Sequence, residues 1–427
     1  MTSNLAERYR SRPATRLSSG YLAVVGLRLV AMRDVLPDLI AFRERGERVG
    51  RAVLTGVVGS APRPEGATLI VGDRGSMAGS VSGGCIEAAV FAEIQQAIAA
   101  GRPVIRSYGV SDETAWDVGL ACGGTFQVLV QPEVPADVEQ AARSEEGTVI
   151  ATILDGADWA DGAGHAGGTG RPGDVGRAGG ALVIEASGEA RDGSGRPGAP
   201  DGPLAGAAAA SRAAIEAAAR RSLEAEASAT VEISAPGGSI EVFLEVFPPR
   251  PRLIVFGGVH VAVALVRLAR ELGYRTIVAD GRAAFANRER FPEADEVIVA
   301  WPEEAFERIG LDGSSYVAVL THDPKFDEPA LALALRSPAR YVGAIGSRRT
   351  QEARRERLRE RGVSDAELAR LRGPIGLDLG GRGASEIALA ILAEMTAVRY
   401  GAAGGPMAQR RRRSARRGGG RGRVLDR

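Results

Sequence analysis

The stretch Leu253-Ile-Val-Phe-Gly-Gly-Val-His-Val-Ala262 decides the fold of the C-terminal half of this chain. Its apolar start predicts a buried strand, and its paired glycines predict a tight turn into a helix that reaches Leu272. A second strand, 276–280, ends in the carboxylate of Asp280. A strand, a glycine turn, a helix and an acid about 20 residues later form the setting of a dinucleotide-binding fingerprint.

Further apolar runs continue this alternation towards the C-terminus. Short, uninterrupted apolar strands separated by helices indicate a parallel sheet that is covered on both faces. We therefore predict an α/β protein whose C-terminal half is a Rossmann-like, doubly wound parallel sheet. The remaining predicted strands are 296–300, 316–320 and 341–345, and a last helix ends near Tyr400.

The N-terminal half predicts a separate α+β domain. A β-rich run lies between Gly50 and Gly59, and a second strand covers 68–71. From Ile86 to Ala99 an apolar residue recurs at every fourth position, which is the stripe of one helix face. Further strands are predicted at 104–108, 126–130, 148–154, 230–233 and 240–246, and the last two are expected to return to the first sheet.

Shifts in composition divide the chain into four parts. Residues 1–31 form a basic extension that we expect to be disordered, and 32–247 form the N-terminal domain. This domain carries a Gly/Ala-rich insertion at about 155–217, which is too poor in large apolar groups to offset the entropy of ordering it. A Rossmann-like domain follows at 248–400, and 401–427 form an Arg/Gly-rich tail, also expected to be disordered.

Composition and charge exclude several classes of protein. Of the 427 residues, 44% are hydrophobic and 25% charged, as in ordinary globular proteins, and no apolar run approaches the roughly 20 residues that cross a bilayer. Two cysteines exclude a disulfide framework and, with three histidines, a Cys-rich zinc site; we expect a cytoplasmic protein. Residues 1–31 carry a charge of +4 and residues 401–427 a charge of +8, and the net charge of the chain is +1. Residues 32–400 therefore carry −11, which disfavours nucleic-acid binding by the folded surface.

Two glycine-rich segments in the N-terminal half carry both cysteines of the chain. Gly79-Ser-Val-Ser-Gly-Gly-Cys-Ile-Glu87 opens directly onto a helix, so its main-chain N–H groups favour an anion such as phosphate, and the same field favours the thiolate form of Cys85. Cys122 is followed in the same way by Gly123 and Gly124. Either thiol could be a small buried hydrophobe. Because paired glycines permit close approach of a ligand, we expect at least one to be functional.

In the C-terminal half, candidate ligand contacts follow the predicted strands. Gly257, His260 and Asp280 belong to the dinucleotide setting, but Val259 stands where the middle glycine of the fingerprint is required. The alternative is that the glycine turn only allows tight packing of strand and helix. His322 follows the strand 316–320, and Ser347 and Arg348 follow 341–345, so these three should lie at the carboxyl edge of the sheet, where an arginine can meet an anion. The alternative for either histidine is a hydrogen-bonded turn residue. Two carboxylates, Glu65 and Glu87, are further candidates for acid–base roles.

Six motifs in sequence order carry a family resemblance. They are Gly59-Ser-Ala-Pro-Arg-Pro-Glu-Gly-Ala67, the Gly79–Glu87 segment, Cys122-Gly-Gly124, Thr321-His-Asp-Pro324, Tyr341-Val-Gly-Ala-Ile-Gly-Ser-Arg-Arg349 and Pro374-Ile-Gly-Leu-Asp-Leu379. Together with the helix 386–394, they resemble the XdhC/CoxI family, the accessory proteins of xanthine dehydrogenase and carbon monoxide dehydrogenase. The resemblance covers about residues 32–400 apart from the insertion. The chain departs from the family at Val259, where glycine is usual, and at Gly383-Ala-Ser385, where Thr-Pro-Glu is more familiar.

The resemblance implies an accessory protein more than a catalyst. Such a protein binds the molybdenum cofactor (molybdopterin), protects it while a cysteine desulfurase replaces an oxo ligand by sulfur, and delivers it to an apo molybdenum hydroxylase. Cys85 and Cys122 are then the candidate cofactor contacts and ligands of molybdenum, a metal that accepts soft thiolates; a homodimer is a further expectation. The full candidate set is Ser82, Gly83, Gly84, Cys85, Cys122, Gly123, Gly124, Gly257, His260, Asp280, His322, Ser347 and Arg348.

Two other functions remain open from the sequence. The Rossmann-like half and Asp280 would also suit an NAD(P)-dependent oxidoreductase. The arginines between Arg410 and Arg417 could bind nucleic acid, although a solubilising tail is the simpler interpretation.

Overall fold

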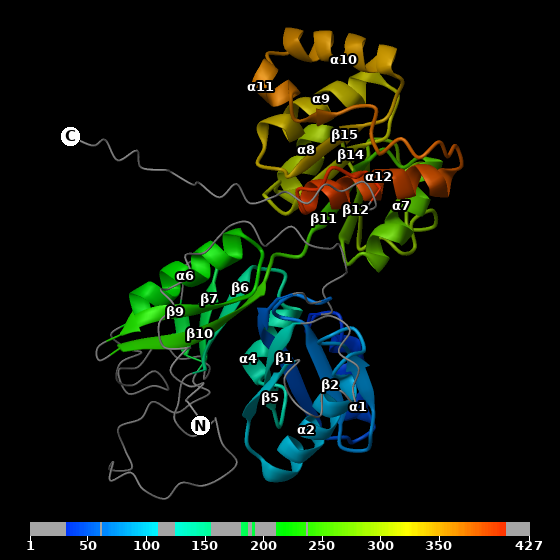
Figure 1. Ribbon diagram of the computed structural model, residues 1–427. Coiled ribbons are helices and arrows are strands. Elements are labelled where there is room, and N and C mark those ends of the chain that lie inside the picture. The colour runs from blue at the N-terminus through cyan, green and yellow to red at the C-terminus, as the bar shows by residue number, and fades with distance from the viewer. Residues whose placement is uncertain are drawn as a thin grey trace, which may run out of the picture. The chain divides into compact units, whose positions relative to one another are not determined.

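The computed structural model describes residues 31–59, 62–109, 124–154, 181–186, 190–192, 211–235 and 238–406. These residues form two compact units, one ending at Arg250 and the other beginning at Pro251 (Figure 1). Among the described residues, no helix is long and apolar enough to cross a membrane.

The first sheet of the N-terminal unit is antiparallel, with strand order β3-β2-β1-β5-β4. Helix α2 packs against it through Val90, Ile94 and Ile98, the predicted apolar stripe. Helices α1 and α4 contribute Leu39 and Val138 to a second cluster. The elements are α1 (Leu36–Glu44), β1 (Val49–Val58), β2 (Thr68–Gly72), β3 (Met77–Gly79), α2 (Glu87–Ala100), β4 (Val104–Tyr108), β5 (Thr125–Gln131) and α4 (Ala136–Arg143).

A second antiparallel sheet of this unit, β8-β7-β6-β10-β9, corrects one prediction. The strands predicted at 230–233 and 240–246 do not return to the first sheet. Strand β10 pairs antiparallel with its sequence neighbour β9 and with β6, whereas both sides of β1 are taken by β2 and β5. The elements are β6 (Thr148–Ile153), β7 (Ala181–Glu185), β8 (Ala190–Asp192), α6 (Arg212–Glu224), β9 (Ala229–Ala235) and β10 (Gly238–Phe247).

Polar contacts join the two sheets of the N-terminal unit. Arg51 of β1 forms a buried ion pair with Glu245 of β10 and also donates to Gln131 of β5. The hydroxyl of Thr230 donates to the carbonyl of Thr55 at 2.7 Å. The two sheets are therefore fastened together along their strands.

The C-terminal unit is the predicted doubly wound fold. Its six parallel strands have the order β13-β12-β11-β14-β15-β16, in which β11 and β14 part the two halves of the sheet. The strands are β11 (Arg252–Phe256), β12 (Arg275–Asp280), β13 (Glu296–Val299), β14 (Ser315–Val319), β15 (Tyr341–Ala344) and β16 (Leu371–Arg372).

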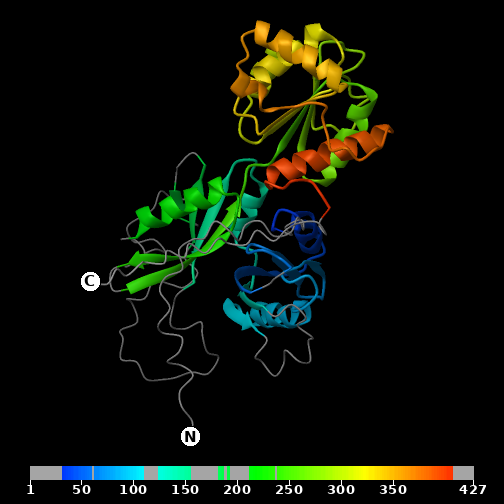
Figure 2. The same cartoon turned by 45° about the horizontal axis from the view of Figure 1, so that its top comes forward.

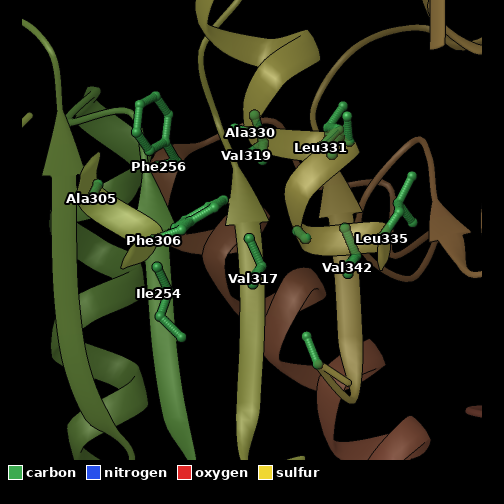
Figure 3. Packing of buried hydrophobic residues seen from close by; sticks show 14 of the residues in the cluster. Ile254, Phe256, Ala305, Phe306, Val317, Val319, Ala330, Leu331, Leu335 and Val342 are labelled. Atoms are coloured by element: carbon green, nitrogen blue, oxygen red, sulfur yellow. The ribbon is translucent and has the colours of Figure 1, made fainter. Parts of the chain in front are cut away.

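Helices cover both faces of this sheet. Helices α7 and α12 lie side by side on one face (Figure 2), where Leu265 and Ile391 pack against Val255. On the other face, Phe306 of α8 and Leu331 of α9 pack against strand residues such as Val317 (Figure 3). The helices are α7 (His260–Glu271), α8 (Pro302–Ile309), α9 (Pro324–Arg336), α10 (Arg348–Glu360), α11 (Asp365–Leu368) and α12 (Ala384–Arg399).

Candidate functional site

The glycine-rich turn before α2 binds an anion, and that anion is the side chain of Glu87. Its carboxylate accepts hydrogen bonds from the main-chain N–H groups of Ser82, Gly83 and Gly84 at 2.9, 3.0 and 2.8 Å. The hydroxyls of Ser80 and Ser82 donate to it at 2.6 and 2.5 Å. Burial would raise the pKa of Glu87, but these hydrogen bonds outweigh it and hold the pKa at about 2.

The rest of the turn is also hydrogen-bonded internally. The hydroxyl of the fully buried Ser82 accepts from the N–H groups of Cys85 and Ile86, both at 3.0 Å. The amides that the sequence offered to a phosphate are thus engaged with the protein itself. A signal was present in the sequence, because an acid in the first helical turn commonly bonds back to the turn before it.

Cys85 directly precedes Ile86, the N-cap residue of α2, and is half-buried against the apolar cluster of the first sheet. Gly84 next to it has a φ of +114°, and no atom lies within 4 Å of the position that a Cβ would take there. The residue directly before Cys85 therefore has open space beside it, on a turn that its own hydrogen bonds hold in place. Cys122 and Gly123 lie outside the described residues, and Gly124 is buried directly before β5.

Glu65 is a second unusual carboxyl group in this unit. It lies in the 59–67 motif, where its carboxylate accepts from the main chain of Val57 and of Thr230. Burial raises the pKa of Glu65 to about 7, more than those hydrogen bonds lower it. A carboxyl group with such a pKa can take up or release a proton near neutral pH. The two acid–base candidates therefore differ, because the pKa of Glu65 is raised whereas that of Glu87 is lowered.

The dinucleotide turn of the C-terminal unit is closed by protein atoms. A Cβ on Gly257, whose φ is +113°, would lie 2.5 Å from the Thr321 methyl group, and one on Gly258 would lie 2.1 Å from the carbonyl oxygen of Phe285. The carboxylate of Asp280 is fully buried; it accepts from the N–H of Gly258 and forms a bidentate pair with Arg282. This geometry favours the packing interpretation of the glycines and leaves Asp280 engaged inside the protein.

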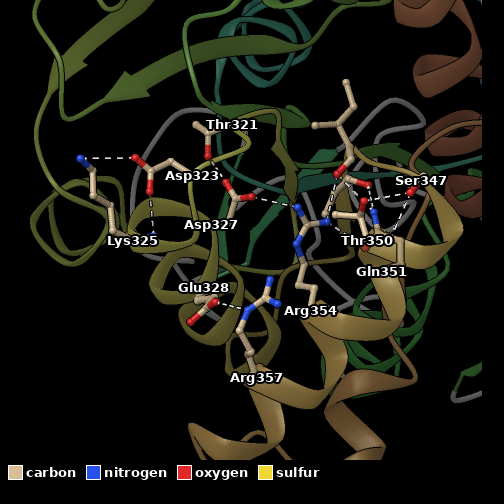
Figure 4. Close-up of polar contacts among 12 residues, drawn as sticks. Thr321, Asp323, Lys325, Asp327, Glu328, Ser347, Thr350, Gln351, Arg354 and Arg357 are labelled. Atoms are coloured by element: carbon tan, nitrogen blue, oxygen red, sulfur yellow. Dashed lines mark hydrogen bonds and ion pairs between the residues drawn. The ribbon is translucent and has the colours of Figure 1, made fainter.

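A buried polar network holds the carboxyl ends of β14 and β15 together (Figure 4). Arg354 donates to Asp327 at 2.8 Å and to the carbonyl of Ile345 at 2.9 Å, while Thr321 bonds to the other oxygen of Asp327. Gln351 donates to the carbonyls at the end of β15. Burial raises the pKa of Asp327 to about 6, against the opposing charge of Arg354.

The candidate residues predicted to lie at the carboxyl edge of the sheet are exposed. Ser347 caps α10 through the N–H of Thr350. His260, His322 and Arg348 are exposed, and none is bonded to another side chain in the described part of the structure. The fold thus gathers the C-terminal candidates at one sheet edge and Ser82, Gly83, Gly84 and Cys85 on one turn of the other unit. No three His, Cys, Asp or Glu side chains of the described residues are grouped so that they could hold a metal ion.

Two family models match the chain. One, described as the XdhC Rossmann domain, matches residues 253–395, and one described as the XdhC and CoxI family matches residues 42–109. A crystal structure described as a xanthine dehydrogenase from Bacillus halodurans has the same fold, with a TM-score of 0.61 and 22% identity over 86% of this chain and 96% of that one.

Three curated relatives agree with these matches. A protein of Bacillus subtilis (strain 168) described as a probable xanthine dehydrogenase subunit is 25% identical over 84% of this chain and 96% of its own length. The molybdenum cofactor insertion chaperone PaoD of Escherichia coli (strain K12) is 25% identical over 86% and 88%. YqeB of Escherichia coli (strain K12), described as uncharacterized, is 34% identical over 40% of this chain, which spans 31% of YqeB. The two family models place residues 42–109 and 253–395 of the chain in the XdhC and CoxI family.

Proposed function

We propose that the chain is a cytoplasmic accessory protein of molybdenum cofactor maturation. It binds the cofactor as cargo, protects it while a cysteine desulfurase exchanges an oxo ligand for sulfur, and delivers it to an apo molybdenum hydroxylase. The family and the similarity to a molybdenum cofactor insertion chaperone over most of both chains support the general role. The desulfurase and the client follow from the family resemblance alone, and a homodimer is a further proposal.

The observation that carries this proposal is the setting of Cys85. The half-buried Cys85 directly follows Gly84, which has open space on its Cβ side, on a turn whose amides and hydroxyls are all bonded internally. A rigid thiol beside open space can bind a soft metal centre without ordering a loop. Cys122 is proposed as a second contact on its sequence setting.

The donor groups of the turn before α2 suit the molybdenum of the cofactor better than its phosphate. The thiol of Cys85 suits molybdenum, whereas the N–H groups of Gly83 and Gly84 already bind the Glu87 carboxylate. A phosphate would have to displace an anion whose pKa is about 2 and which therefore stays charged at neutral pH. We infer that this turn holds the metal end and that the phosphate end is bound elsewhere.

An NAD(P)-dependent oxidoreductase is not favoured by the same geometry. The Cβ side of Gly257 faces the Thr321 methyl group and that of Gly258 faces the Phe285 carbonyl oxygen, so tight packing accounts for both glycines. The carboxylate that would bind a ribose, Asp280, is buried and paired with Arg282. The glycines and the carboxylate of the dinucleotide setting thus have structural roles within the protein itself.

The test is cofactor analysis of the full chain purified from cells that make the molybdenum cofactor. Molybdenum and oxidised pterin are measured in the parent and in Cys85→Ser, Cys122→Ser and Met77→Leu variants. Met77→Leu is the control, because it removes an exposed sulfur from the same unit. We expect both quantities to fall several-fold in at least one cysteine variant and to stay at the parent level in the control.

Two outcomes would contradict the proposal in different ways. Undiminished cofactor in both cysteine variants would refute the thiol contact. No molybdenum and no pterin in the parent itself would refute the carrier function.

A further inference from the structure

We infer that the carboxyl edge of the C-terminal sheet binds a planar nitrogen heterocycle that carries a phosphate, using Trp301, Phe326, Arg282 and Lys325. The inference rests on the proposed function in one respect only, since a pterin phosphate is one of the two ligands with this chemistry. The other is a nucleotide.

Three strands bring these side chains together. Trp301 follows β13, Arg282 follows β12, and Lys325 and Phe326 lie in the first turn of α9 after β14. The ring of Trp301 lies 4.8 Å from that of Phe326, tilted by 41°. Phe326 is 2% exposed and packs against Gly281, where a Cβ would lie 2.7 Å from its ring. Phe326 is therefore a fixed base on which Trp301 rests.

The position and exposure of Trp301 have no structural explanation in the core. It is 51% exposed although it is a large apolar side chain at the end of a buried sheet. It also occupies the N-cap position of α8, where it supplies no capping hydrogen bond and where Ser, Thr, Asp or Asn would stabilise the helix. Departures from local preference of this kind concentrate at functional sites.

Two cations flank the aromatic pair. The guanidinium of Arg282 lies 5.4 Å and the ammonium of Lys325 5.0 Å from the centre of the Phe326 ring. Arg282 uses Nε and one Nη on Asp280, and its Nη1 donates to no atom of the described residues. Lys325, the only lysine of the chain, is 59% exposed with Asp323 at 3.3 Å. Both cations thus retain donors that an anion can accept.

The combination selects a class of ligand. The half-exposed indole ring of Trp301 can stack on a flat heterocycle whatever its substituents, and the neighbouring cations can bind a phosphate attached to that heterocycle. The surface lies outside the carboxyl ends of parallel strands, which is where doubly wound sheets bind ligands. Asp280 is paired with Arg282 and Asp323 with Lys325, so each carboxylate of this surface is balanced by one of the two cations.

The test is calorimetric titration of the full chain with four probes: GMP, neopterin monophosphate, guanosine and ribose 5-phosphate. We expect at least one of the first two to bind, and the probes that lack either the phosphate or the ring to bind at least tenfold more weakly. Tighter binding of neopterin monophosphate would identify the pterin as the source, and tighter binding of GMP would identify a nucleotide.

Variants assign binding to this surface. Trp301→Ala should weaken binding by about 5- to 100-fold, the range for loss of one stacking aromatic, and Trp301→Phe should restore most of it. Lys325→Gln should weaken binding and reduce its dependence on salt. Tyr400→Ala, which removes another exposed aromatic ring, should change nothing.

Failure here is distinguishable from failure of the proposed function. If neither ring phosphate binds the parent at millimolar concentration, or if Trp301→Ala binds as tightly as the parent, the inference is overturned. Molybdenum and pterin in the purified parent are measured independently of these titrations and decide the carrier function alone.

Discussion

The turn before α2 and the carboxyl edge of the C-terminal sheet are both built to hold an anion, but only one of them supplies its own. At the turn, Glu87 takes the hydrogen bonds of Ser82, Gly83 and Gly84. At the edge, Arg348 and Arg349 stand exposed at the start of α10 without a partner in the described structure. The N–H groups of the turn before α2 are thus already bonded to a carboxylate of the chain, whereas the carboxyl edge keeps two arginines that no carboxylate of the described residues pairs with.

This difference limits what a glycine-rich turn can prove. Main-chain N–H groups that converge on one point will bind whichever anion the chain places there, and a carboxylate three to five residues away has a large advantage in effective concentration over a free ligand. A ligand site is better indicated by charged groups that the fold leaves unpaired. The following predictions test the two halves of this comparison.

The largest expected effect concerns the buried support of the carboxyl edge. Arg354→Leu should lower the free energy of unfolding by about 3 to 5 kcal/mol, because the buried Asp327 would lose its ion-pair partner. Urea unfolding followed by circular dichroism measures the loss. Arg357→Leu is the control: Arg357 is 39% exposed and its partner Glu328 keeps Arg361, so less than about 1 kcal/mol should be lost. Equal losses in the two variants would mean that the buried network is not special.

Glu87→Ala should empty the turn before α2 and lower the free energy of unfolding at pH 7 by about 2 kcal/mol. The pKa of Glu87 is about 2 in the folded state, below its ordinary 4.5. The ionised carboxylate therefore contributes its full stabilisation of the folded state above pH 4.5, and this contribution is lost as the pH falls towards 2. Unfolding in urea at pH 7 and at pH 3 should show a gap between parent and variant that narrows at pH 3.

Added sulfate sharpens this prediction. If the emptied turn is an anion site, sulfate should raise the unfolding midpoint of Glu87→Ala more than that of the parent. Glu386→Ala is the matched control, because Glu386 accepts from the N–H groups of Arg382 and Gly383 in the turn before α12. No response of Glu87→Ala to sulfate would show that the turn does not select anions.

The pKa of Glu65 predicts a stability change of the opposite sign. Because burial raises that pKa to about 7, the folded state holds a proton that the unfolded state releases near pH 4.5. Stability should therefore fall as the pH rises from 4.5 through 7, and Glu65→Gln should be more stable than the parent by about 1 to 2 kcal/mol at pH 8 but not at pH 4. Urea unfolding at the two pH values measures this, with the exposed Glu133→Gln as the control that should show no such dependence. A pH-independent difference would exclude a raised pKa.

The fold could largely be predicted because its signals are local. The C-terminal strands and helices were predicted from runs and periodicity within single elements, and the parallel order followed from their alternation. The pairing of β10 with β6 could not be predicted, because the two strands are far apart in the sequence and neither specifies its partner. Pairing of distant strands leaves no local pattern in the sequence.

The site divides in the same way. The anion chemistry of the turn before α2 was predictable from its glycines, and Glu87 in the first helical turn was the available signal for the occupant, although the hydrogen bonds themselves depend on the positive φ of Gly83 and Gly84. The role of Trp301 was also missed, because an isolated tryptophan after a strand resembles any core residue. A tryptophan directly before Pro302 at a helix start, where a capping side chain is preferred, was the available signal.

Replacing Arg348 or Arg349 should change the free energy of unfolding only slightly, but the sign of that change distinguishes the carboxyl edge from the turn before α2. Arg348 and Arg349 occupy the first turn of α10, where the helix dipole opposes a positive charge. Arg348→Gln and Arg349→Gln should therefore raise the free energy of unfolding, each by about 0.3 to 1 kcal/mol at low ionic strength. Arg359→Gln, in the last turn of the same helix and paired with Asp365, should lower it instead. A stabilisation that disappears in high salt would mean that these two arginines are held against the dipole for a reason other than stability, as an anion-binding edge requires. If both substitutions destabilise the protein, the arginines serve the fold, and the carboxyl edge is as internally satisfied as the turn before α2.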